Sequence, residues 1–250
     1  DGTTRWSIDI PGDPPFDPDD PNDGGAPTVA DFTGDGMPEI GVAGRTRHTV
    51  FRQNPNDPTS GEIVWSVPTQ DKTSSVTVAT VFDLDLDGIP EVIYRDETTL
   101  HIFRGTDGAT LFSTPVGSCT WQEYAIVVDV DGDGSANVVV PANNNCGFGT
   151  QRGLIVYKDA GPGWAPTRKI WNQHAYHVTN VNDNATIPAV AANNWLTPIG
   201  DPLNNFRQNA ALGVVPKIPL PDLTASHIDF VCDANGNTAT VLIGNGGWAA

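Results

Sequence analysis

The sequence predicts an all-β protein built from short antiparallel strands. Its 26 glycines and 21 prolines make up 47 of 250 residues and recur every few positions, so hardly any stretch is long enough for a three-turn helix. Valine, threonine, asparagine and aspartate are abundant, which is typical of strands joined by tight turns. Four related segments also recur about 50 residues apart, which indicates a repeat architecture.

Charge and hydropathy exclude several classes of partner. The 13 lysines and arginines face 30 aspartates and glutamates, a net charge of −17, so we expect no basic patch that would bind nucleic acid or an anionic membrane surface. No run of 18 apolar residues is present, and membrane insertion is therefore not expected. Seven tryptophans and nine phenylalanines supply a packed core. Asp1 reads as the start of a mature, secreted-type chain or of a fragment.

Each copy of the repeat has an acidic or amide residue that opens a turn. These residues are Asp31, Asp83, Asp129 and Asn180, separated by 52, 46 and 51 positions. An apolar strand enters the turn, a second strand leaves it and two further strands follow, which is the pattern of propeller-type blades of four antiparallel strands. The predicted blades span residues 27–68, 76–116, 123–171 and 172–212. Residues 1–10 resemble the fourth strand of a blade, so they either close a ring of four or belong to a larger propeller.

The acidic turns follow the pattern D-x-(D/T)-x-D-G-x-x-(E/N). Oxygens at positions 1, 3, 5 and 9, together with the main-chain carbonyl at position 7, can converge on one hard cation, and glycine at position 6 permits a sharp turn. The predicted ligands are Asp31, Thr33, Asp35, Met37 and Glu39 in the first turn, Asp83, Asp85, Asp87, Ile89 and Glu91 in the second, and Asp129, Asp131, Asp133, Ser135 and Asn137 in the third. We therefore expect up to three Ca²⁺ ions, with plain hairpin turns as the alternative.

Other metals and other turn types fit these loops less well. An EF-hand needs a bidentate Glu at position 12, where this chain has Val42, Tyr94 and Val140, and it needs helices on both sides. Mg²⁺ keeps several waters and requires octahedral geometry, whereas zinc and copper prefer imidazole or thiolate ligands. In the fourth copy, asparagines replace the carboxylates, so we expect this turn to lack an ion.

These segments resemble the FG-GAP (VCBS-type) repeats of integrin-like β-propellers over residues 27–212. The resemblance implies Ca²⁺ in the acidic turns and an extracellular role in adhesion or scaffolding, with lectin activity in some members. Thr33 and Asn137 depart from the all-acidic pattern, which weakens the first and third predicted sites. Residues 222–250 resemble the opening strands of a CARDB-type, immunoglobulin-like β module, and the proline-rich residues 215–221 read as a stiff linker.

A segment rich in aromatic and histidine residues, 164–184, stands apart from the repeat pattern. Trp171, His174, Tyr176 and His177 are candidates for a ligand site, because aromatic rings stack on the apolar faces of sugars. The two histidines are also candidate transition-metal ligands. The third interpretation is a structural strand with buried aromatic side chains.

Three cysteines are too few for a disulfide framework. Cys119 and Cys146 bracket one strand–loop–strand unit, so they either form a disulfide in an oxidising compartment or remain buried thiols. If they form a disulfide, Cys232 is left over.

The combined expectation is an extracellular, calcium-binding structural or adhesion protein, with self-assembly through unpaired terminal strands as one option. Its expected partners are calcium and either other surface or matrix proteins or copies of itself. The alternative is a lectin that binds glycans through the aromatic-histidine segment. No hydrolase, P-loop or dinucleotide-binding motif occurs, so an enzyme is not expected.

Overall fold

The computed structural model describes residues 2–11, 24–74, 76–121, 123–161, 163–192 and 207–212, and the backbone of residues 223–233 and 236–245. The chain divides into two compact units, residues 1–214 and 215–250. All regular structure in these residues is β-strand, which confirms the predicted all-β class. The described part of the chain contains no helix with the length and hydropathy needed to cross a membrane.

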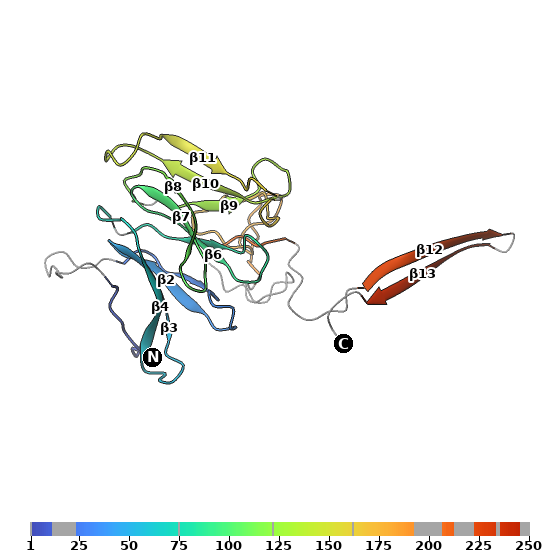
Figure 1. Ribbon diagram of the computed structural model, residues 1–250, viewed down its shortest axis with the longest axis horizontal. Coiled ribbons are helices and arrows are strands. Elements are labelled where there is room, and N and C mark those ends of the chain that lie inside the picture. Colours follow the sequence, from blue (N-terminus) through green and yellow to red (C-terminus); the bar gives the residue numbers. More distant parts are fainter. Residues whose placement is uncertain are drawn as a thin grey trace. The chain divides into compact units, whose positions relative to one another are not determined.

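The first unit contains three antiparallel sheets (Figure 1). Sheet 1 consists of β1 (Thr28–Ala30), β2 (Glu39–Ala43), β3 (Arg47–Gln53) and β4 (Gly61–Pro68). Sheet 2 consists of β5 (Thr80–Phe82), β6 (Glu91–Arg95), β7 (Thr99–Phe103) and β8 (Thr110–Pro115). Sheet 3 consists of β9 (Ile126–Val128), β10 (Asn137–Ala142) and β11 (Gly153–Tyr157). Sheets 1 and 2 are four-stranded meanders, as expected of propeller-type blades.

All three sheets place an acidic turn between their first two strands in the same register. The last residue of the inner strand pairs with the ninth residue of the turn, as Ala30↔Glu39, Phe82↔Glu91 and Val128↔Asn137. Strand pairing fixes both ends of each turn, so the turns have equal length. Strand β5 contacts both β1 and β9, which brings the three inner strands side by side.

Two apolar clusters hold the three sheets together. Val92 and Tyr94 of β6 pack in the cluster shared by sheets 1 and 2, whereas Ile93 packs in the cluster shared by sheets 2 and 3. Side chains alternate in this way because successive residues of a strand point to opposite faces. All five residues of β6 are buried, including the charged Glu91 and Arg95 at its two ends.

A threonine hydrogen bond repeats between successive sheets. Thr28 Oγ1 donates to Ala79 O at 2.9 Å, and Thr80 Oγ1 donates to Ala125 O at 2.5 Å. Each acceptor lies directly before the inner strand of the next sheet. The contact therefore ties neighbouring repeats together near their inner strands, in addition to the apolar packing.

Residues 2–11 pack on sheet 1 in the way that β4 packs on sheet 2. The Trp6 ring lies against Gly61, where a Cβ atom would come within 2.5 Å of it. The Trp65 ring of β4 lies against Gly108, where a Cβ atom would come within 2.7 Å. The described residues of this segment form no strand, so the likeness to a fourth blade strand is one of sequence and packing.

Sheet 3 has three strands in the described part of the chain. After β11 the chain passes to the acidic turns, where Ala165 N donates to Leu84 O at 2.8 Å and Ala136 N donates to Ala165 O at 3.0 Å. The second and third turns therefore satisfy the main-chain groups of Ala165, which a fourth strand would have paired with β11. Within the described residues, β11 is an edge of its sheet.

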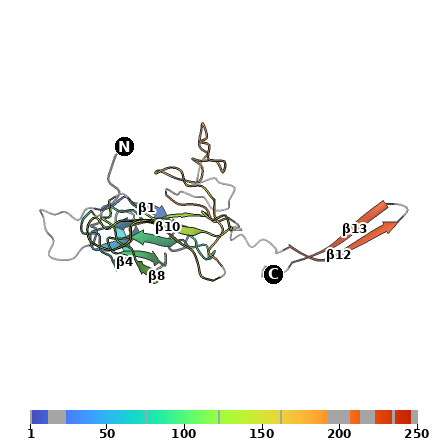
Figure 2. The ribbon, with the colours of Figure 1, turned by 90° about the horizontal axis from the view of Figure 1, so that it is seen from above.

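The fourth copy differs from a four-stranded blade in its described residues, 172–192 and 207–212, which form isolated bridges but no strand. This region folds around Arg168, whose buried guanidinium donates to Val178 O at 2.8 Å and to Val181 O at 2.7 Å. The carbonyls of Val178 and Val181 thus face this buried cation in a segment that forms no strand. Figure 2 shows part of the chain after β11 projecting to one side of the sheets.

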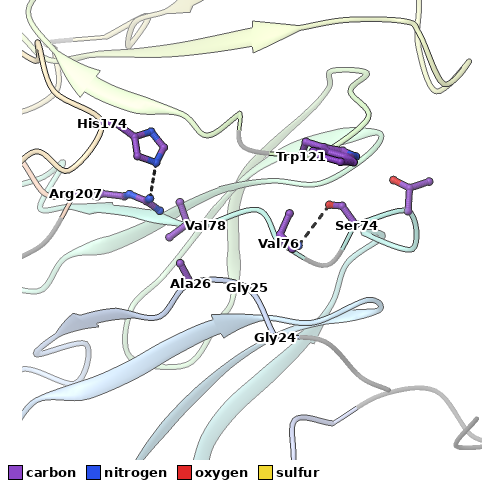
Figure 3. Close-up of a pocket in the computed structure, with 10 residues that line it drawn as sticks. Gly24, Gly25, Ala26, Ser74, Val76, Val78, Trp121, His174 and Arg207 are labelled. Atoms are coloured by element: carbon purple, nitrogen blue, oxygen red, sulfur yellow. Dashed lines mark hydrogen bonds between the residues drawn. The ribbon is translucent and has the colours of Figure 1, made fainter. Parts of the chain in front are cut away.

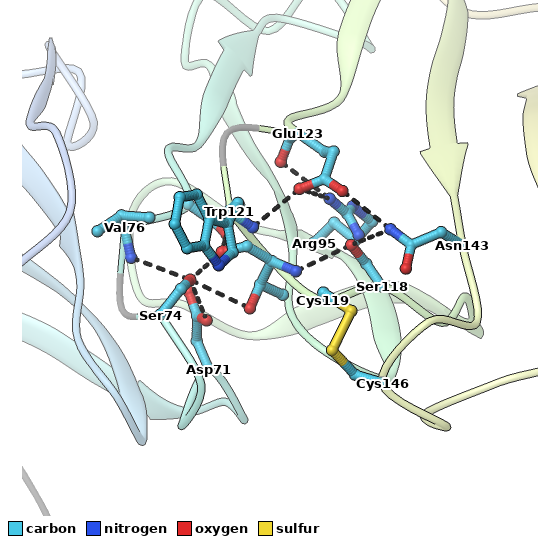
Figure 4. A network of polar contacts seen from close by, with 12 residues as sticks. Asp71, Ser74, Val76, Arg95, Ser118, Cys119, Trp121, Glu123, Asn143 and Cys146 are labelled. Carbon is cyan, nitrogen blue, oxygen red and sulfur yellow. Dashed lines mark hydrogen bonds and ion pairs between the residues drawn. A yellow bond between two sulfur atoms is a disulfide. The ribbon is translucent and has the colours of Figure 1, made fainter.

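The connection between β8 and β9 is cross-linked to the loop after β10 (Figure 4). Cys119 and Cys146, the predicted pair, form a disulfide with Cα atoms 5.5 Å apart. Beside it, the Glu123 carboxylate accepts hydrogen bonds from Asn143 Nδ2 at 2.9 Å and from Trp121 N at 2.8 Å. These contacts hold the segment around Trp121 in one position.

The second unit is an antiparallel hairpin of β12 (Leu223–Asp233) and β13 (Gly236–Asn245), with an irregularity between Ala225 and His227. Cys232 lies in β12. The predicted linker, residues 215–221, lies outside the described residues. An immunoglobulin-like sandwich has about seven strands, so this hairpin corresponds to only a small part of one.

Candidate functional site

Each acidic turn is folded around the carboxylate of its first residue. The main-chain N–H at position 6 donates to that carboxylate in every turn, as Gly36 N to Asp31 (2.8 Å), Gly88 N to Asp83 (2.9 Å) and Gly134 N to Asp129 (3.3 Å). The three glycines have φ values of 84°, 84° and 93°, a conformation that residues with a Cβ rarely adopt. The sequence pattern therefore specifies the turn locally, through one carboxylate and one glycine.

The residue at position 9 fastens the turn from the other side. Glu39 Oε2 accepts hydrogen bonds from Phe32 N at 2.7 Å and Thr33 N at 3.1 Å. In the second and third turns the equivalent bonds are Leu84 N to Glu91 (2.8 Å) and Val130 N to Asn137 (2.9 Å). All three side chains at position 9 are buried. Sequence reasoning predicts these residues as metal ligands but does not anticipate their role as acceptors for the turn itself.

The carboxylates of each turn converge. In each turn, three residues contribute one carboxylate oxygen each, and the three oxygens lie within 4.8 Å of one another. The three groups are Asp31/Asp35/Glu39, Asp83/Asp85/Glu91 and Asp129/Asp131/Asp133. Ca²⁺ takes six to eight oxygen ligands at about 2.3–2.6 Å, so two ligands of one ion lie at most about 5 Å apart. The spacing of the oxygens is therefore compatible with one such ion in each turn.

The other predicted ligands have defined positions in the turns. The position-5 carboxylates of Asp35, Asp87 and Asp133 accept the main-chain N–H of Met37, Ile89 and Ser135 at 2.8, 2.7 and 2.9 Å. In the first turn, Thr33 Oγ1 donates to Glu39 Oε1 at 3.1 Å. The hydrogen bonds orient the peptide at position 7, whose carbonyl remains a predicted ligand.

The basic side chains are unevenly distributed among the three turns. Lys158 Nζ lies 2.8 Å from Asp133 and 3.5 Å from Asp131, and Lys169 Nζ lies 3.8 Å from Asp129. In the first turn, an Arg52 nitrogen lies 3.8 Å from Asp35. Among the ion pairs of the described residues, none involves the second turn. Within the described residues, this turn combines four carboxylates without a neutralising lysine or arginine.

Burial makes the second turn electrostatically unfavourable when its carboxylates are ionised. Desolvation, reinforced by the neighbouring aspartates, raises the pKa of Glu91 to about 8. Burial likewise raises the pKa of Asp83, and main-chain N–H groups of Gly88 and Leu86 partly offset this rise. Among the described residues, no hydrogen bond of normal geometry reaches the buried Oδ1 atom of Asp83. By contrast, the hydrogen bond from Lys158 lowers the pKa of Asp133 in the third turn. A bound cation would provide a partner for the buried oxygen and would favour the ionised form of the buried carboxyl group.

The aromatic-histidine candidates do not form one surface. Tyr176 is fully buried, and Trp171 stacks on it with ring centroids 4.4 Å apart. His177 Nδ1 lies 3.1 Å from Thr179 Oγ1. His174 is the member of the set that lines a cavity. Two of the four candidates thus belong to the packed interior of the fourth copy.

That cavity has a volume of about 470 Å³ (Figure 3). Its lining residues are Gly24, Gly25, Ala26, Thr73, Ser74, Val76, Val78, Trp121, His174 and Arg207. Sequence reasoning missed Trp121 and Arg207, because residues so far apart along the chain share no local pattern. The one indication in the sequence is that Trp121 follows Cys119 by two residues, so a disulfide at Cys119 would restrain its position.

Comparisons with known proteins agree with this arrangement. A family model described as FG-GAP-like repeat matches residues 31–92 and 83–140, which include all three acidic turns. The crystal structure of the V. cholerae biofilm matrix protein Bap1 is similar to the chain, with a TM-score of 0.60 and 30% identity, over 73% of this chain and 28% of that chain. A search of curated proteins gave no match. Residues 31–140 of this chain therefore contain FG-GAP-like repeats.

Proposed function

We propose that this chain is a calcium-stabilised repeat module of an extracellular matrix or adhesion protein, and that it has no enzymatic role. The observation that carries the calcium proposal is the second acidic turn. It holds convergent carboxylates, a buried Asp83 oxygen that no hydrogen bond of normal geometry reaches among the described residues, and a Glu91 whose pKa is raised by burial. The matrix role is supported by the likeness to Bap1, of which this chain matches 28%.

A hard cation would supply positive charge to the clustered carboxylates of the turns. Bound Ca²⁺ accepts carboxylate oxygens as ligands and offsets the repulsion between them. The second turn is proposed to bind most tightly, because it has four carboxylates and no basic side chain beside it among the described residues. In the third turn, Lys158 and Lys169 compete with the ion for Asp133 and Asp129. In the first turn, position 3 is the neutral Thr33.

The calcium proposal is tested by isothermal titration of the chelator-treated protein with Ca²⁺ and, separately, with Mg²⁺. We expect Ca²⁺ to bind and to raise the melting temperature, and the variant Asp85→Asn to lose the tightest site. Asp57→Asn, an exposed turn aspartate outside the acidic turns, is the matched control. An unchanged melting temperature with excess EDTA and with excess Ca²⁺ would contradict the proposal.

We further propose that the outer face of sheet 3 mediates self-assembly. Strand register makes Leu154 and Val156 of β11 equivalent to Leu100 and Ile102 of β7. The β7 pair is buried, with exposures of 0% and 3%, whereas the β11 pair is 67% and 48% exposed. In sheet 2 these two positions pack against the next sheet, whereas the equivalent positions in sheet 3 are exposed. They lie on β11, which is an edge strand in the described part of the chain.

Sedimentation velocity over a range of protein concentrations tests this second proposal. We expect the wild-type protein to associate and the double variant Leu154→Lys, Val156→Lys to remain monomeric. Leu111→Lys on β8 is the control, because Leu111 is 48% exposed but lies in a complete four-stranded sheet. A wild-type protein that stays monomeric at high concentration would exclude self-assembly through this face.

A further inference from the structure

A basic residue recurs at the same place beside all three acidic turns. In each sheet, the residue after position 9 of the turn pairs with an aromatic residue on the third strand, β3, β7 or β11 (Figure 1), and a basic residue follows that aromatic residue. The three basic residues are Arg52, Arg104 and Lys158. Strand pairing therefore places each of them next to position 9 of its own turn.

In the first and third repeats, this basic side chain contacts the carboxylate at position 5 of the turn. Lys158 Nζ lies 2.8 Å from Asp133 in the third turn. In the first turn, a guanidinium nitrogen of Arg52 lies 3.8 Å from Asp35, but another lies only 2.6 Å from Glu62 on β4. The positive charge of Arg52 is therefore shared with an acidic group outside the turn, whereas Lys158 contacts acidic groups of the turn itself.

In the second repeat, an acidic residue outside the turn holds the basic side chain. Arg104 Nη1 lies 2.9 Å from Asp107, three residues further along the chain. The chain after β7 nevertheless runs against the second turn, since a Cβ atom at Gly105 would come within 2.4 Å of Pro90 O. Asp87 occupies position 5 of this turn, the place at which the other two turns contact their basic side chains. The pair with Asp107 thus engages a side chain whose counterparts contact the turns.

A positive charge tethered beside a turn opposes the binding of a divalent ion there. It offsets the repulsion between the carboxylates before the ion arrives, and it repels the ion once that ion is bound. The first and third turns are a matched pair for this effect. Each brings three carboxylates together and has one neutral side chain in the ligand pattern, Thr33 or Asn137. Their basic side chains differ in how closely they contact the turn.

We propose that the basic residue after the third strand is a tethered counter-ion of its own turn, and that its partner outside the turn sets the affinity of that turn for Ca²⁺. This inference rests on the proposed calcium function and adds residues that are not ligands. Arg104, held by Asp107, leaves the second turn to bind most tightly. Arg52, shared with Glu62, weakens the first turn in part, and Lys158 weakens the third turn most.

One glycine amide in each turn reports calcium binding at that turn. The N–H groups of Gly36, Gly88 and Gly134 donate to the first carboxylate of their turns, so their chemical shifts should change when an ion binds that carboxylate. Titration of the chelator-treated, ¹⁵N-labelled chain with Ca²⁺, followed by two-dimensional NMR, gives one dissociation constant for each turn. We expect the constants to increase in the order second, first, third turn.

The variant Lys158→Met removes the tethered charge from the third turn. We expect Ca²⁺ to bind there about three- to tenfold more tightly, because water and salt only partly screen a unit charge that lies a few ångströms from a divalent ion. The constant of the second turn should not change. Lys72→Met, at an exposed lysine outside the acidic turns, is the matched control and should leave all three constants unchanged.

The variant Asp107→Asn releases Arg104 toward the second turn and is expected to weaken Ca²⁺ binding there about three- to tenfold. Asp57→Asn is the matched control, because each aspartate accepts the main-chain N–H two residues ahead at 2.9 Å, but Asp57 pairs with Thr59 and not with an arginine. Adding Arg104→Met to Asp107→Asn should restore the wild-type constant, since the released charge is then absent.

The outcomes separate this inference from the calcium proposal. An unchanged second-turn constant in Asp107→Asn, or an unchanged third-turn constant in Lys158→Met, would overturn the counter-ion inference and leave the calcium proposal intact. A double variant that binds as weakly as Asp107→Asn would also overturn it, because the loss would then come from Asp107 itself. No calcium-dependent shift at any of the three glycines would refute the calcium proposal and this inference with it.

Discussion

Replacing Glu91 by glutamine is predicted to stabilise the calcium-free protein while weakening its response to calcium. Glu91 is 3% exposed, and burial raises its pKa from 4.5 to about 8. Between these values the folded state binds more protons than the unfolded state, so stability falls as pH rises through this window. The penalty for ionising Glu91 at pH 8 is then at most about 5 kcal/mol, at about 1.4 kcal/mol for each pKa unit.

The amide oxygen of glutamine can accept the hydrogen bond that Leu84 N donates to the Glu91 carboxylate, but glutamine carries no charge. In EDTA at pH 8 we expect Glu91→Gln to melt up to about 20 °C above the wild type, since 1 kcal/mol moves the melting temperature of a domain of this size by about 2–4 °C. The difference should shrink below about 1 kcal/mol at pH 5, where little of the penalty remains. With Ca²⁺ present, the wild type should gain more stability than the variant.

Differential scanning fluorimetry at pH 5 and pH 8, with EDTA or with Ca²⁺, measures all four conditions. Glu62→Gln is the control, because Glu62 pairs with Arg52 at 2.6 Å on a partly exposed strand and should change stability by less than about 1 kcal/mol. A calcium-free Glu91→Gln variant that melts at or below the wild type at pH 8 would refute the predicted penalty for ionising Glu91. The prediction also fails if the variant keeps the full stabilisation by Ca²⁺.

Three further predictions concern the scaffold, each measured by urea unfolding. Replacing Cys119 and Cys146 by serine is expected to lower the free energy of unfolding by about 3–4 kcal/mol, as loop entropy predicts for a separation of 27 residues; an unchanged midpoint would mean that the bridge does not constrain the chain. Thr28→Val and Thr80→Val are each expected to cost about 1–2 kcal/mol, because a buried carbonyl loses its donor; the two losses should add, and strong non-additivity would show that the contacts are not independent. Gly108→Ala should cost more than about 1 kcal/mol, since its φ is 72° and a Cβ would meet a tryptophan ring at 2.7 Å; a neutral result would show that this ring moves freely.

The acidic turns are largely predictable from sequence because they are local structures. The residues that build the first turn, from Asp31 to Glu39, lie within nine positions of one another. A carboxylate at position 1 and a glycine at position 6 are enough to specify the turn, and the apolar runs on both sides specify the strands. The apolar run that enters the second turn agrees with β5, all three residues of which are buried.

The charge environment of each turn is not predictable in this way. Lys158 reaches the third turn from the residue after β11, 25 positions beyond Asp133. No such side chain pairs with the second turn in the described residues, and this difference separates turns that look similar in sequence. Proximity between distant segments depends on how the sheets pack, which the repeat pattern does not encode.

The fourth copy of the repeat also differs from what its local sequence pattern predicts. Its spacing and its apolar residues predict a blade, yet the described segment folds around Arg168 and buries Tyr176. A buried guanidinium satisfies several main-chain carbonyls at once, and this tertiary network outweighs the local strand preference. Sequence alone indicates the aromatic-histidine segment as unusual but cannot show which of its side chains are exposed.

The amino-acid sequence by itself determined the all-β class, the repeat and the three carboxylate turns, since short-range hydrogen bonds and strand periodicity control them. Tertiary structure alone decided which turn lacks a basic neighbour among the described residues, which side chains of sheet 3 are exposed, and that Trp121 and Arg207 line the same cavity. These last features join residues as much as 183 positions apart, from Gly24 to Arg207. Their contacts depend on the packing of whole sheets, so no local pattern specifies them.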